Sequence, residues 1–274
     1  MSDTTKTALV TGANSGIGLA VAVELARRGY RVVGTVRSDA KAEAVHAAAA
    51  GAGVAVETRL LDVTDAERCA AIVDGLELDA LVNNAGYGLT GAVEDVTDAE
   101  ARALFETMVL APVRLARLAL PGMRARGGGR IVMMSSIYGR VTTPLTGWYQ
   151  AAKHALEGIS DGLRNEVARD GIRVILVEPG GVRTAIWEDL RRDVEARGES
   201  PYGDAYRRTE QITRLASPLM ASPESCARTV ASALTASRPR SRYLVGPDAV
   251  LTAAAAYVVP TAIRDLVTRR IVGL

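Results

Sequence analysis

The sequence predicts an α/β fold, a doubly wound arrangement in which helices cover both faces of a parallel, seven-stranded sheet. Three observations lead to this prediction. Strand-like apolar segments alternate with helical segments along most of the chain, and a glycine-rich turn joins the first strand to the first helix. The 274 residues, 48% of them hydrophobic, suffice for one well-buried domain. Strands that alternate with helices pair in parallel through right-handed crossovers.

The expected elements follow one another with short connections. Strands are expected at residues 6–11, 31–36, 54–61, 79–83, 129–135, 172–178 and 241–245. Helices are expected at residues 16–28, 39–50, 65–75, 98–126, 149–169 and 223–236. Short apolar runs bounded by turn residues are typical of buried strands, whereas longer segments with a 3.6-residue apolar period are typical of helices.

One segment departs from this alternation. Residues 185–222 are rich in Arg and Glu and are punctuated by Pro201 and Pro218. A long insertion in a compact domain is usually a functional loop or a lid. We therefore expect a single domain over residues 1–274, with a substrate loop or lid at about 185–222.

The glycine-rich turn after the first strand reads Thr11-Gly-Ala-Asn-Ser-Gly-Ile-Gly18. Gly12 allows a tight turn, Gly16 lets the backbone approach a pyrophosphate, and Gly18 permits close packing of helix on strand. The next helix begins here and presents unpaired N–H groups and a partial positive charge. A glycine-rich turn alone is a weak signal. Between a strand and a helix, it predicts a dinucleotide site in a Rossmann arrangement.

Ser136, Tyr149 and Lys153 stand in a spacing that suits proton transfer at a carbonyl oxygen. A tyrosine hydroxyl has a pKa near ~10. A lysine four residues later on a helix lies on the same face, and its ammonium favours the phenolate and can lower that pKa. A serine from another segment can donate to the carbonyl oxygen and hold it against Tyr149. These three residues are therefore the predicted catalytic group, and a redox agent would bind at the glycine-rich turn.

Composition and charge disfavour several classes of function. The 33 basic and 31 acidic residues leave a formal net charge of +2, which argues against nucleic-acid binding as the main role. Cys69 and Cys226 lie far apart and in no metal-ligand spacing. We therefore expect reduced thiols, no metal site and a cytoplasmic location. The first strand begins almost at once, so we expect no signal peptide.

The longest apolar stretch, residues 249–260, contains 12 residues and is too short to span a bilayer. We expect no membrane span. The stretch is expected to be a buried tail or a subunit contact, and contact with one leaflet of a membrane is the alternative.

Taken together, the motifs resemble those of the short-chain dehydrogenase/reductase family, in its single-domain branch, from residue 6 to about 184. They occur in the family's order: Thr11–Gly18, Asp62-Val63, Asn83-Asn-Ala-Gly86, Ser136, Tyr149-Gln-Ala-Ala-Lys153, and Pro179-Gly180 followed by Thr184. The resemblance implies that Tyr149 is the general acid in reduction or the base in oxidation. It also implies that Lys153 binds the nicotinamide ribose and tunes Tyr149, and that Ser136 orients the substrate oxygen.

The resemblance also implies where a nucleotide cofactor would lie. Asp62 would bond the adenine amine with Val63 against the ring, Asn84-Ala85-Gly86 would lie beneath the ribose, and the segment from Pro179 would hold the nicotinamide carboxamide. The implied contacts are Gly12, Asn14, Ser15, Gly16, Ile17, Gly18, Arg37, Asp62, Val63, Asn84, Ala85, Gly86, Tyr149, Lys153, Pro179, Gly180, Val182 and Thr184.

The end of the second strand indicates which cofactor is used. NAD-selective proteins place an acid there to bind the adenosine ribose diol. This chain has Val36 followed by Arg37. An apolar residue cannot bind the diol, whereas a guanidinium can clamp a 2′-phosphate. We expect NADP(H), with NAD(H) as the less favoured alternative.

One position departs from the family's pattern. Where the family has an asparagine that supports a water linking the lysine to solvent, this chain has Met108. A thioether cannot replace an amide. Pro112, four residues on, has no N–H, so the Met108 carbonyl loses its helical partner and could hold the relay water instead. The other interpretation is that the protein needs no fast relay or has left redox chemistry.

These observations predict an NADP(H)-dependent oxidoreductase that interconverts a ketone or aldehyde with an alcohol on an apolar small molecule. Trp148 and Trp187 could line the substrate pocket, although core packing is an equal alternative. A non-redox cyclase, isomerase or dehydratase that reuses Tyr149 and Lys153 is the alternative function. The resemblance implies a homodimer or homotetramer, with contacts through helices 98–126 and 149–169.

Overall fold

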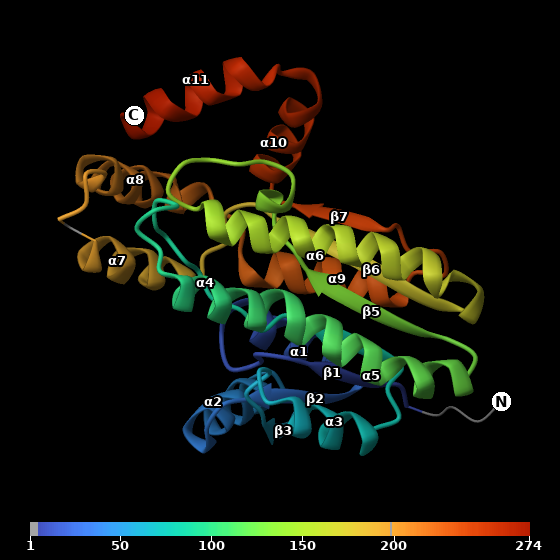
Figure 1. Ribbon diagram of the computed structural model, residues 1–274. Coiled ribbons are helices and arrows are strands. Elements are labelled where there is room, and N and C mark those ends of the chain that lie inside the picture. Colours follow the sequence, from blue (N-terminus) through green and yellow to red (C-terminus); the bar gives the residue numbers. More distant parts are fainter. Residues whose placement is uncertain (1–4, 198) are drawn as a thin grey trace.

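A computed structural model describes residues 5–197 and 199–274. Its centre is a seven-stranded sheet in the order β3-β2-β1-β4-β5-β6-β7 (Figure 1). Every neighbouring pair is parallel. The strands are β1 (Thr7–Val10), β2 (Arg31–Val36), β3 (Glu57–Leu60), β4 (Ala80–Asn83), β5 (Gly129–Met134), β6 (Ile172–Pro179) and β7 (Arg242–Val245). The predicted doubly wound α/β fold is confirmed.

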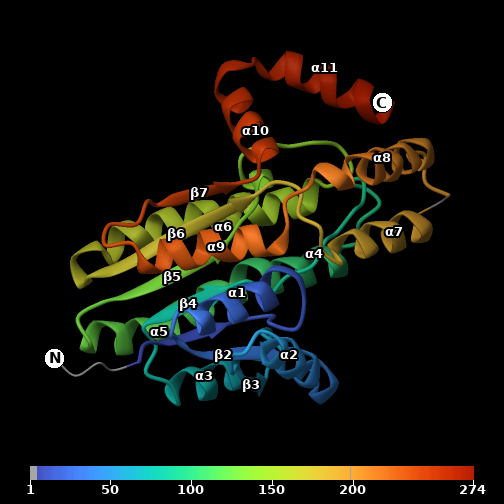
Figure 2. The same ribbon diagram turned by 180° about the vertical axis from the view of Figure 1, so that it is seen from behind.

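Helices cover both faces of the sheet (Figures 1 and 2). The helices are α1 (Gly16–Arg27), α2 (Asp39–Gly51), α3 (Ala66–Asp74), α4 (Asp98–Phe105), α5 (Ala111–Ala125), α6 (Gly147–Glu166), α7 (Ile186–Ala196), α8 (Gly203–Ala216), α9 (Pro223–Thr235), α10 (Pro247–Val258) and α11 (Thr261–Val272). One apolar core lies between the sheet and α1, α2 and α9, and a second lies between the sheet and α3, α5 and α6. The chain order reverses between β1 and β4, and in such sheets ligands bind at that point.

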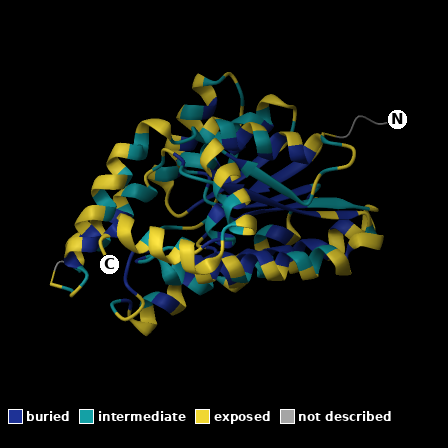
Figure 3. Cartoon of the chain, turned by 90° about the horizontal axis from the view of Figure 1, so that it is seen from above, coloured by how far each residue is buried: buried dark blue, intermediate teal, exposed yellow. Residues whose placement is uncertain are grey.

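The burial pattern follows from this layering. Figure 3 shows dark-blue strands inside the molecule and yellow residues on the outer sides of the helices. β1 and β4 are buried along their whole length, as expected for central parallel strands covered on both faces. β3 lies at the edge and carries exposed residues, so only Glu57–Leu60 of the predicted strand 54–61 pairs with β2.

The predicted helix 98–126 is interrupted. α4 ends at Phe105, a π turn covers Glu106–Leu110, and α5 follows. Pro112 is the physical reason, because it has no N–H to offer the carbonyl four residues earlier. The chain inserts one residue instead, and the N–H of Ala111 donates to the carbonyl of Glu106, five residues back.

The segment expected to be a loop or lid contains two helices, α7 and α8. Residue 198 lies outside the described residues. Tyr206 on α8 is 1% exposed, and its hydroxyl donates to Asp95 Oδ2 at 2.6 Å. The same hydroxyl accepts from the backbone N–H of Ala92 at 2.6 Å. These bonds attach α8 to the segment between β4 and α4.

The C-terminal helices α10 and α11 lie beyond β7 at one end of the molecule (Figure 1). The expectation of a buried tail at residues 249–260 is wrong, because Leu251 is 71% exposed and Tyr257 is 80% exposed. Only small residues such as Ala249 and Ala253 pack inward, against the segment after β5. In the described part of the chain, no helix combines the length and apolarity needed to cross a membrane.

Replacing Tyr206 with Phe should loosen α8, because the buried hydroxyl bonds Asp95 and the backbone of Ala92. A hydroxyl lost from a buried pair of hydrogen bonds costs roughly 1–3 kcal/mol. We expect faster amide hydrogen exchange in α8 and a lower unfolding temperature. Tyr202→Phe is the matched control, because its hydroxyl bonds Glu94 at the surface. Equal effects of the two substitutions would contradict the assignment.

Candidate active site

The glycine-rich turn meets the end of β4 at the point where the chain order reverses. The Thr11 hydroxyl accepts from the backbone N–H groups of Asn84 and Ala85, at 2.9 and 3.0 Å. In return, the Asn84 side-chain amide donates to the carbonyls of Thr11 and Gly12, at 3.0 and 3.2 Å. This exchange holds the turn against the sheet. Among the predicted cofactor residues, Asn84 thus has an evident structural role.

The turn requires its glycines. Gly12 and Gly16 have φ values of +64° and +52°, in the left-handed region that favours glycine. Gly18 has no space for a side chain, because a Cβ there would overlap the Gly12 carbonyl and the Asn84 amide. The predicted roles of Gly12 and Gly18 in the turn therefore match the backbone. The cradle also fits a diphosphate, because it leaves the first N–H groups of α1 directed outward from the turn.

A cleft of about 620 Å³ lies over the carboxyl ends of the strands. The sequence-predicted residues that line it are Gly12, Asn14, Ser15, Gly16, Ile17, Gly18, Arg37, Asp62, Val63, Asn84, Ala85, Gly86, Tyr149, Lys153, Pro179 and Thr184. Seven separate chain segments thus contribute to the cleft. The cleft extends from the end of β2 to the start of α7. A cleft of this size can hold a dinucleotide with a small substrate beside it.

Two of the predicted cofactor residues, Gly180 and Val182, do not line the cleft. The backbone N–H of Gly181 donates to Asp248 Oδ2 at 2.6 Å, and a Cβ on Gly180 would overlap the same carboxylate. Val182 is 5% exposed and packs in the core beside α9. The chain turns away from the cleft after Pro179 and returns at Thr184. These two residues therefore shape the segment without lining the cleft.

Helix α6 carries Tyr149 and Lys153 on one face toward the cleft. The Lys153 ammonium donates to the Met134 carbonyl at 2.8 Å, and its nitrogen lies 5.6 Å from the centre of the Tyr149 ring. Ser136 follows β5, and its hydroxyl accepts from the N–H of Tyr138 at 3.1 Å and donates to the Pro179 carbonyl at 3.4 Å. The predicted catalytic residues are therefore brought together from two segments.

Burial controls the ionisation of this group. Burial raises the pKa of the Tyr149 phenol above its ordinary value, while the Ser136 hydroxyl opposes the rise. The expected lowering of this pKa by Lys153 is not found, because loss of hydration dominates and Tyr138 adds to the rise. Burial also lowers the pKa of Lys153 to about 8, and the neighbouring Glu157 carboxylate opposes that change. At neutral pH, Tyr149 is thus protonated and Lys153 is charged.

The other end of the cleft suits an adenosine. Asp62 Oδ1 accepts from the N–H and the hydroxyl of Thr64, at 3.0 and 2.7 Å, and these bonds lower the pKa of its carboxyl. An ionised Asp62 with its second oxygen free of these bonds is a good acceptor for an amino group. At the end of β2, the buried Val36 is followed by the exposed side chain of Arg37.

Sequence reasoning missed part of the cleft wall. α7 contributes Ile186, Glu188, Asp189 and Arg192, and the backbone N–H of Gly88 donates to Asp189 Oδ2 at 3.3 Å. The signal was present as a three- and four-residue spacing, which places these positions on one helix face. A loop, which is what the sequence predicts for this segment, has no such repeating face.

The two tryptophans occupy other places. Trp148 packs edge-on against Phe105 and donates to the Val93 carbonyl, and Trp187 donates to the Val182 carbonyl at 2.7 Å. Neither is among the residues that line the cleft, whereas Tyr87 is. Core packing, the alternative for Trp148 and Trp187, therefore describes them better than a pocket role.

Met108 lies in the π turn, is 3% exposed and lines the cleft. Its side chain packs closely over Gly86, where a Cβ would lie 3.2 Å from Met108 Cε. An apolar group thus occupies the place at which the family's asparagine was expected. Whether the backbone carbonyl of Met108 supports a relay water stays a prediction.

Comparisons with known proteins agree with this geometry. The family model described as short chain dehydrogenase matches residues 6–195. A short-chain dehydrogenase structure from Streptomyces avermitilis superposes with a TM-score of 0.79, is 34% identical, and covers 100% of this chain and 98% of its own. The NADPH-dependent 3-dehydrocapnine reductase of Ornithobacterium rhinotracheale is 30% identical over 94% of each chain. Retinol dehydrogenase 8 of Bos taurus is 34% identical over 88% of this chain and 82% of its own length.

Replacing Gly18 with Ala should abolish dinucleotide binding, because its Cβ would displace the Gly12 carbonyl and the Asn84 amide. We expect at least a tenfold rise in the dissociation constant of NADPH, about 1.4 kcal/mol or more of binding free energy. Fluorescence titration measures it. Gly51→Ala in α2 is the matched control, because nothing lies within 4 Å of its Cβ position. Unchanged NADPH binding in Gly18→Ala would show that the turn does not hold the cofactor.

Proposed function

The chain belongs to the short-chain dehydrogenase/reductase family, and from this premise we propose that it is an NADP(H)-dependent reductase of a ketone or aldehyde. The observation that carries the proposal is that Tyr149 and Lys153 line one cleft with the glycine-rich turn, with the Ser136 hydroxyl next to the Tyr149 phenol. A proton donor and a diphosphate cradle in one cleft are the two parts that hydride chemistry on a carbonyl needs.

Each residue of the catalytic group has a defined task in this proposal. When bound, the nicotinamide supplies the hydride. Tyr149 donates its phenolic proton to the substrate oxygen, which takes up negative charge during reduction. Ser136 donates a hydrogen bond to the same oxygen and orients it. Lys153 stabilises the phenolate that remains on Tyr149, because a positive charge close to the ring favours the ionised form.

The protonated phenol is the form of Tyr149 from which a reduction starts. A general acid must carry its proton before the reaction, and burial keeps Tyr149 protonated at neutral pH. Oxidation would need the phenolate at the start, and forming that anion in a buried site is costly. At neutral pH the protonated Tyr149 can therefore act directly as the acid in a reduction.

The end of β2 supports NADP(H) over NAD(H). Val36 offers no acceptor for a ribose diol, and Arg37 borders the cleft with an exposed guanidinium suited to a 2′-phosphate. The similar reductase from Ornithobacterium rhinotracheale is named NADPH-dependent, which agrees with this choice.

The proposed substrate is an apolar small molecule. Tyr87, Met108 and Ile186 give the cleft apolar and aromatic surface near Tyr149. The similarity to retinol dehydrogenase 8, whose name specifies a lipophilic alcohol, supports the same class. The charged groups of α7, Glu188 and Arg192, would lie at the cleft's rim, so a polar end on the substrate is compatible with this wall.

Two expectations about the protein's organisation remain proposals. We take residues 1–274 as a single domain in which α7 and α8 serve as the lid of the substrate cleft. We also propose a homodimer or homotetramer that uses the outer faces of α5 and α6. A cytoplasmic location also stays a prediction.

Consumption of NADPH tests the proposed function. Purified protein should oxidise NADPH with members of a panel of apolar ketones and aldehydes, followed by loss of nicotinamide absorbance. Tyr149→Phe removes the proton donor and keeps the ring, so turnover should fall at least ~100-fold while NADPH still binds. Tight NADPH binding without oxidation on any substrate would instead favour a cyclase, isomerase or dehydratase at the same site.

Arg37→Ala tests the cofactor preference. The substitution should raise the KM for NADPH at least ~10-fold and change the KM for NADH little, because only NADPH carries the 2′-phosphate. Arg173→Ala is the control, since this exposed arginine lies in β6, away from the cleft. Equal changes for both cofactors would contradict the role given to Arg37.

A further inference from the structure

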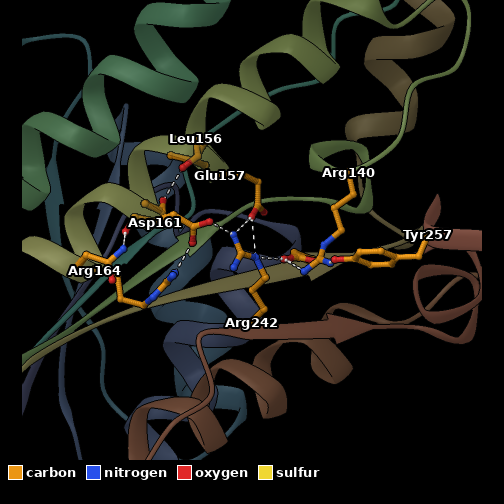
Figure 4. Close-up of polar contacts among 10 residues, drawn as sticks. Arg140, Leu156, Glu157, Asp161, Arg164, Arg242 and Tyr257 are labelled. Carbon is orange, nitrogen blue, oxygen red and sulfur yellow. Dashed lines mark hydrogen bonds and ion pairs between the residues drawn. The ribbon is translucent and has the colours of Figure 1, made fainter. Parts of the chain in front are cut away.

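A network of ion pairs joins α6 to β6 and β7 (Figure 4). Its centre is Glu178 on β6, which is 0% exposed. Arg140 donates to both oxygens of Glu178, at 2.5 and 2.9 Å, and Arg242 on β7 lies 3.1 Å from the same carboxylate. Arg242 also reaches α6, where it pairs with Glu157 at 3.0 Å and with Asp161 at 2.6 Å.

Glu157 is the member of this network nearest to the proposed chemistry along the helix. It lies one helical turn beyond Lys153, which itself lies one turn beyond Tyr149, so the three side chains share a face of α6. The Glu157 side chain is 8% exposed and Lys153 is 6% exposed. Two oppositely charged groups one turn apart in a poorly solvated place interact more strongly than a surface pair does.

One oxygen of Glu157 is not used by the arginines. Oε2 accepts from Arg242 at 3.1 Å, whereas Oε1 is buried and has no hydrogen-bond partner among the described residues. The Ser135 hydroxyl oxygen is likewise buried and has no hydrogen-bond partner among the described residues. Both oxygens border one small space, because a Cβ built on Gly139 would lie 2.9 Å from Ser135 Oγ and 3.3 Å from Glu157 Oε1. Ser135 directly follows Met134, whose carbonyl accepts from Lys153.

Glu157 has the smallest share of positive charge in this network, because its one arginine, Arg242, also pairs with Asp161 and Glu178. The two arginines of the network, Arg140 and Arg242, face three carboxylates, Glu157, Glu178 and Asp161. Arg164 also pairs with Asp161, from the more exposed side. A buried carboxylate without a full share of positive charge is costly. Protonated Lys153 supplies the missing share for Glu157.

Other groups around Lys153 do not provide a closer negative charge. On α6 the side chains one turn to either side of Lys153 are Tyr149 and Glu157, and the carbonyl that Lys153 bonds belongs to Met134 at the end of β5. The π turn contributes Met108, an uncharged thioether. The acidic groups of the cleft, Asp62, Glu188 and Asp189, come from the far end of the cleft and from α7, and the basic ones are Arg37 and Arg192.

We propose that Glu157 is a positioning residue that acts through Lys153: its carboxylate is the internal counter-charge that keeps the lysine protonated from the side of α6 remote from the glycine-rich turn. The inference rests on the proposed function for its catalytic meaning, because a charged Lys153 supports Tyr149. Burial and the nearby Glu178 raise the pKa of the Glu157 carboxyl, and the ion pair with Arg242 opposes that rise and holds the carboxylate in place beside Lys153.

The direction of the pKa changes agrees with this assignment. Burial lowers the pKa of Lys153 to about 8, and the Glu157 carboxylate raises it against that effect. Removing the carboxylate should therefore lower the pKa of Lys153 further. Because the ammonium exists only below that pKa, activity that needs it would be lost at a lower pH than in the parent protein.

Lysine reactivity tests the proposal without any substrate. The chain has three lysines, Lys6, Lys41 and Lys153, so each can be followed by mass spectrometry after brief treatment with acetic anhydride. The acetylation rate of Lys153 between about pH 6 and pH 10 gives the midpoint of its titration. Glu157→Gln should shift that midpoint down by about one pH unit or more, while Lys6 and Lys41 keep theirs.

The matched control is Asp161→Asn, which removes another acidic partner of Arg242 from the same helix, two turns from Lys153. It should leave the midpoint of Lys153 unchanged within about 0.3 pH unit, and Glu157→Asp, which keeps the charge, should restore most of the parent value. An unchanged midpoint in Glu157→Gln, or an equal shift in Asp161→Asn, would overturn the proposal. Should Glu157→Gln not fold, Glu157→Met, which lacks the charge and keeps a side chain of similar length, takes its place with the same expected downward shift.

The kinetic consequence separates this inference from the proposed function. If NADPH oxidation is found, the alkaline decline of kcat in Glu157→Gln should move down in pH with the Lys153 midpoint, whereas the KM for NADPH measured at about pH 6 should change little. If the parent protein oxidises no NADPH, the proposed reductase function fails, yet the lysine titration still decides whether Glu157 is the counter-charge.

Discussion

The contact between the first turn and the end of β4 is the constraint on which the rest of the site depends. Thr11 and Asn84 exchange hydrogen bonds across it, and Gly18 has no space for even a methyl group. This close approach fixes the start of α1 against the centre of the sheet. On either side of this point the chain adds strands in opposite directions along the sheet. The connections therefore diverge here and leave the cleft open between them.

Burial has opposite effects on the pKa values of Tyr149 and Lys153. It retains the proton on Tyr149 and weakens the hold of Lys153 on its own proton. Lys153, with a pKa of about 8, is therefore the group whose charge changes readily near neutral pH, whereas Tyr149 keeps its proton until the reaction takes it. Arg242 joins Glu157 on α6 to the buried Glu178, which also pairs with Arg140 (Figure 4). The helix therefore connects Lys153 in the cleft to a set of ion pairs.

Much of the fold and most of the cleft could be predicted from sequence, because their signals are local. The glycine-rich turn, the strand alternation and the helical spacing of Tyr149 and Lys153 each depend on a few neighbouring residues. The errors have non-local causes. Gly180 and Val182 leave the cleft wall because Asp248, far along the chain, binds the adjacent backbone. The pKa of Tyr149 rises because packing from several elements removes its water, which no spacing reveals.

The π turn between α4 and α5 rotates α5 about its own axis relative to α4. In an α-helix each residue adds roughly 100°, so one inserted residue turns the following helix by about that angle. Leu104 in α4 packs toward α6, whereas Leu115 in α5 packs toward the sheet, although an uninterrupted helix would place these two leucines on nearly the same side. The insertion lets one continuous rod bury two differently directed faces. Met108 lies in this widened turn and lines the cleft. The same insertion that lets α4 and α5 pack in different directions therefore also places the Met108 side chain beside the proposed active site.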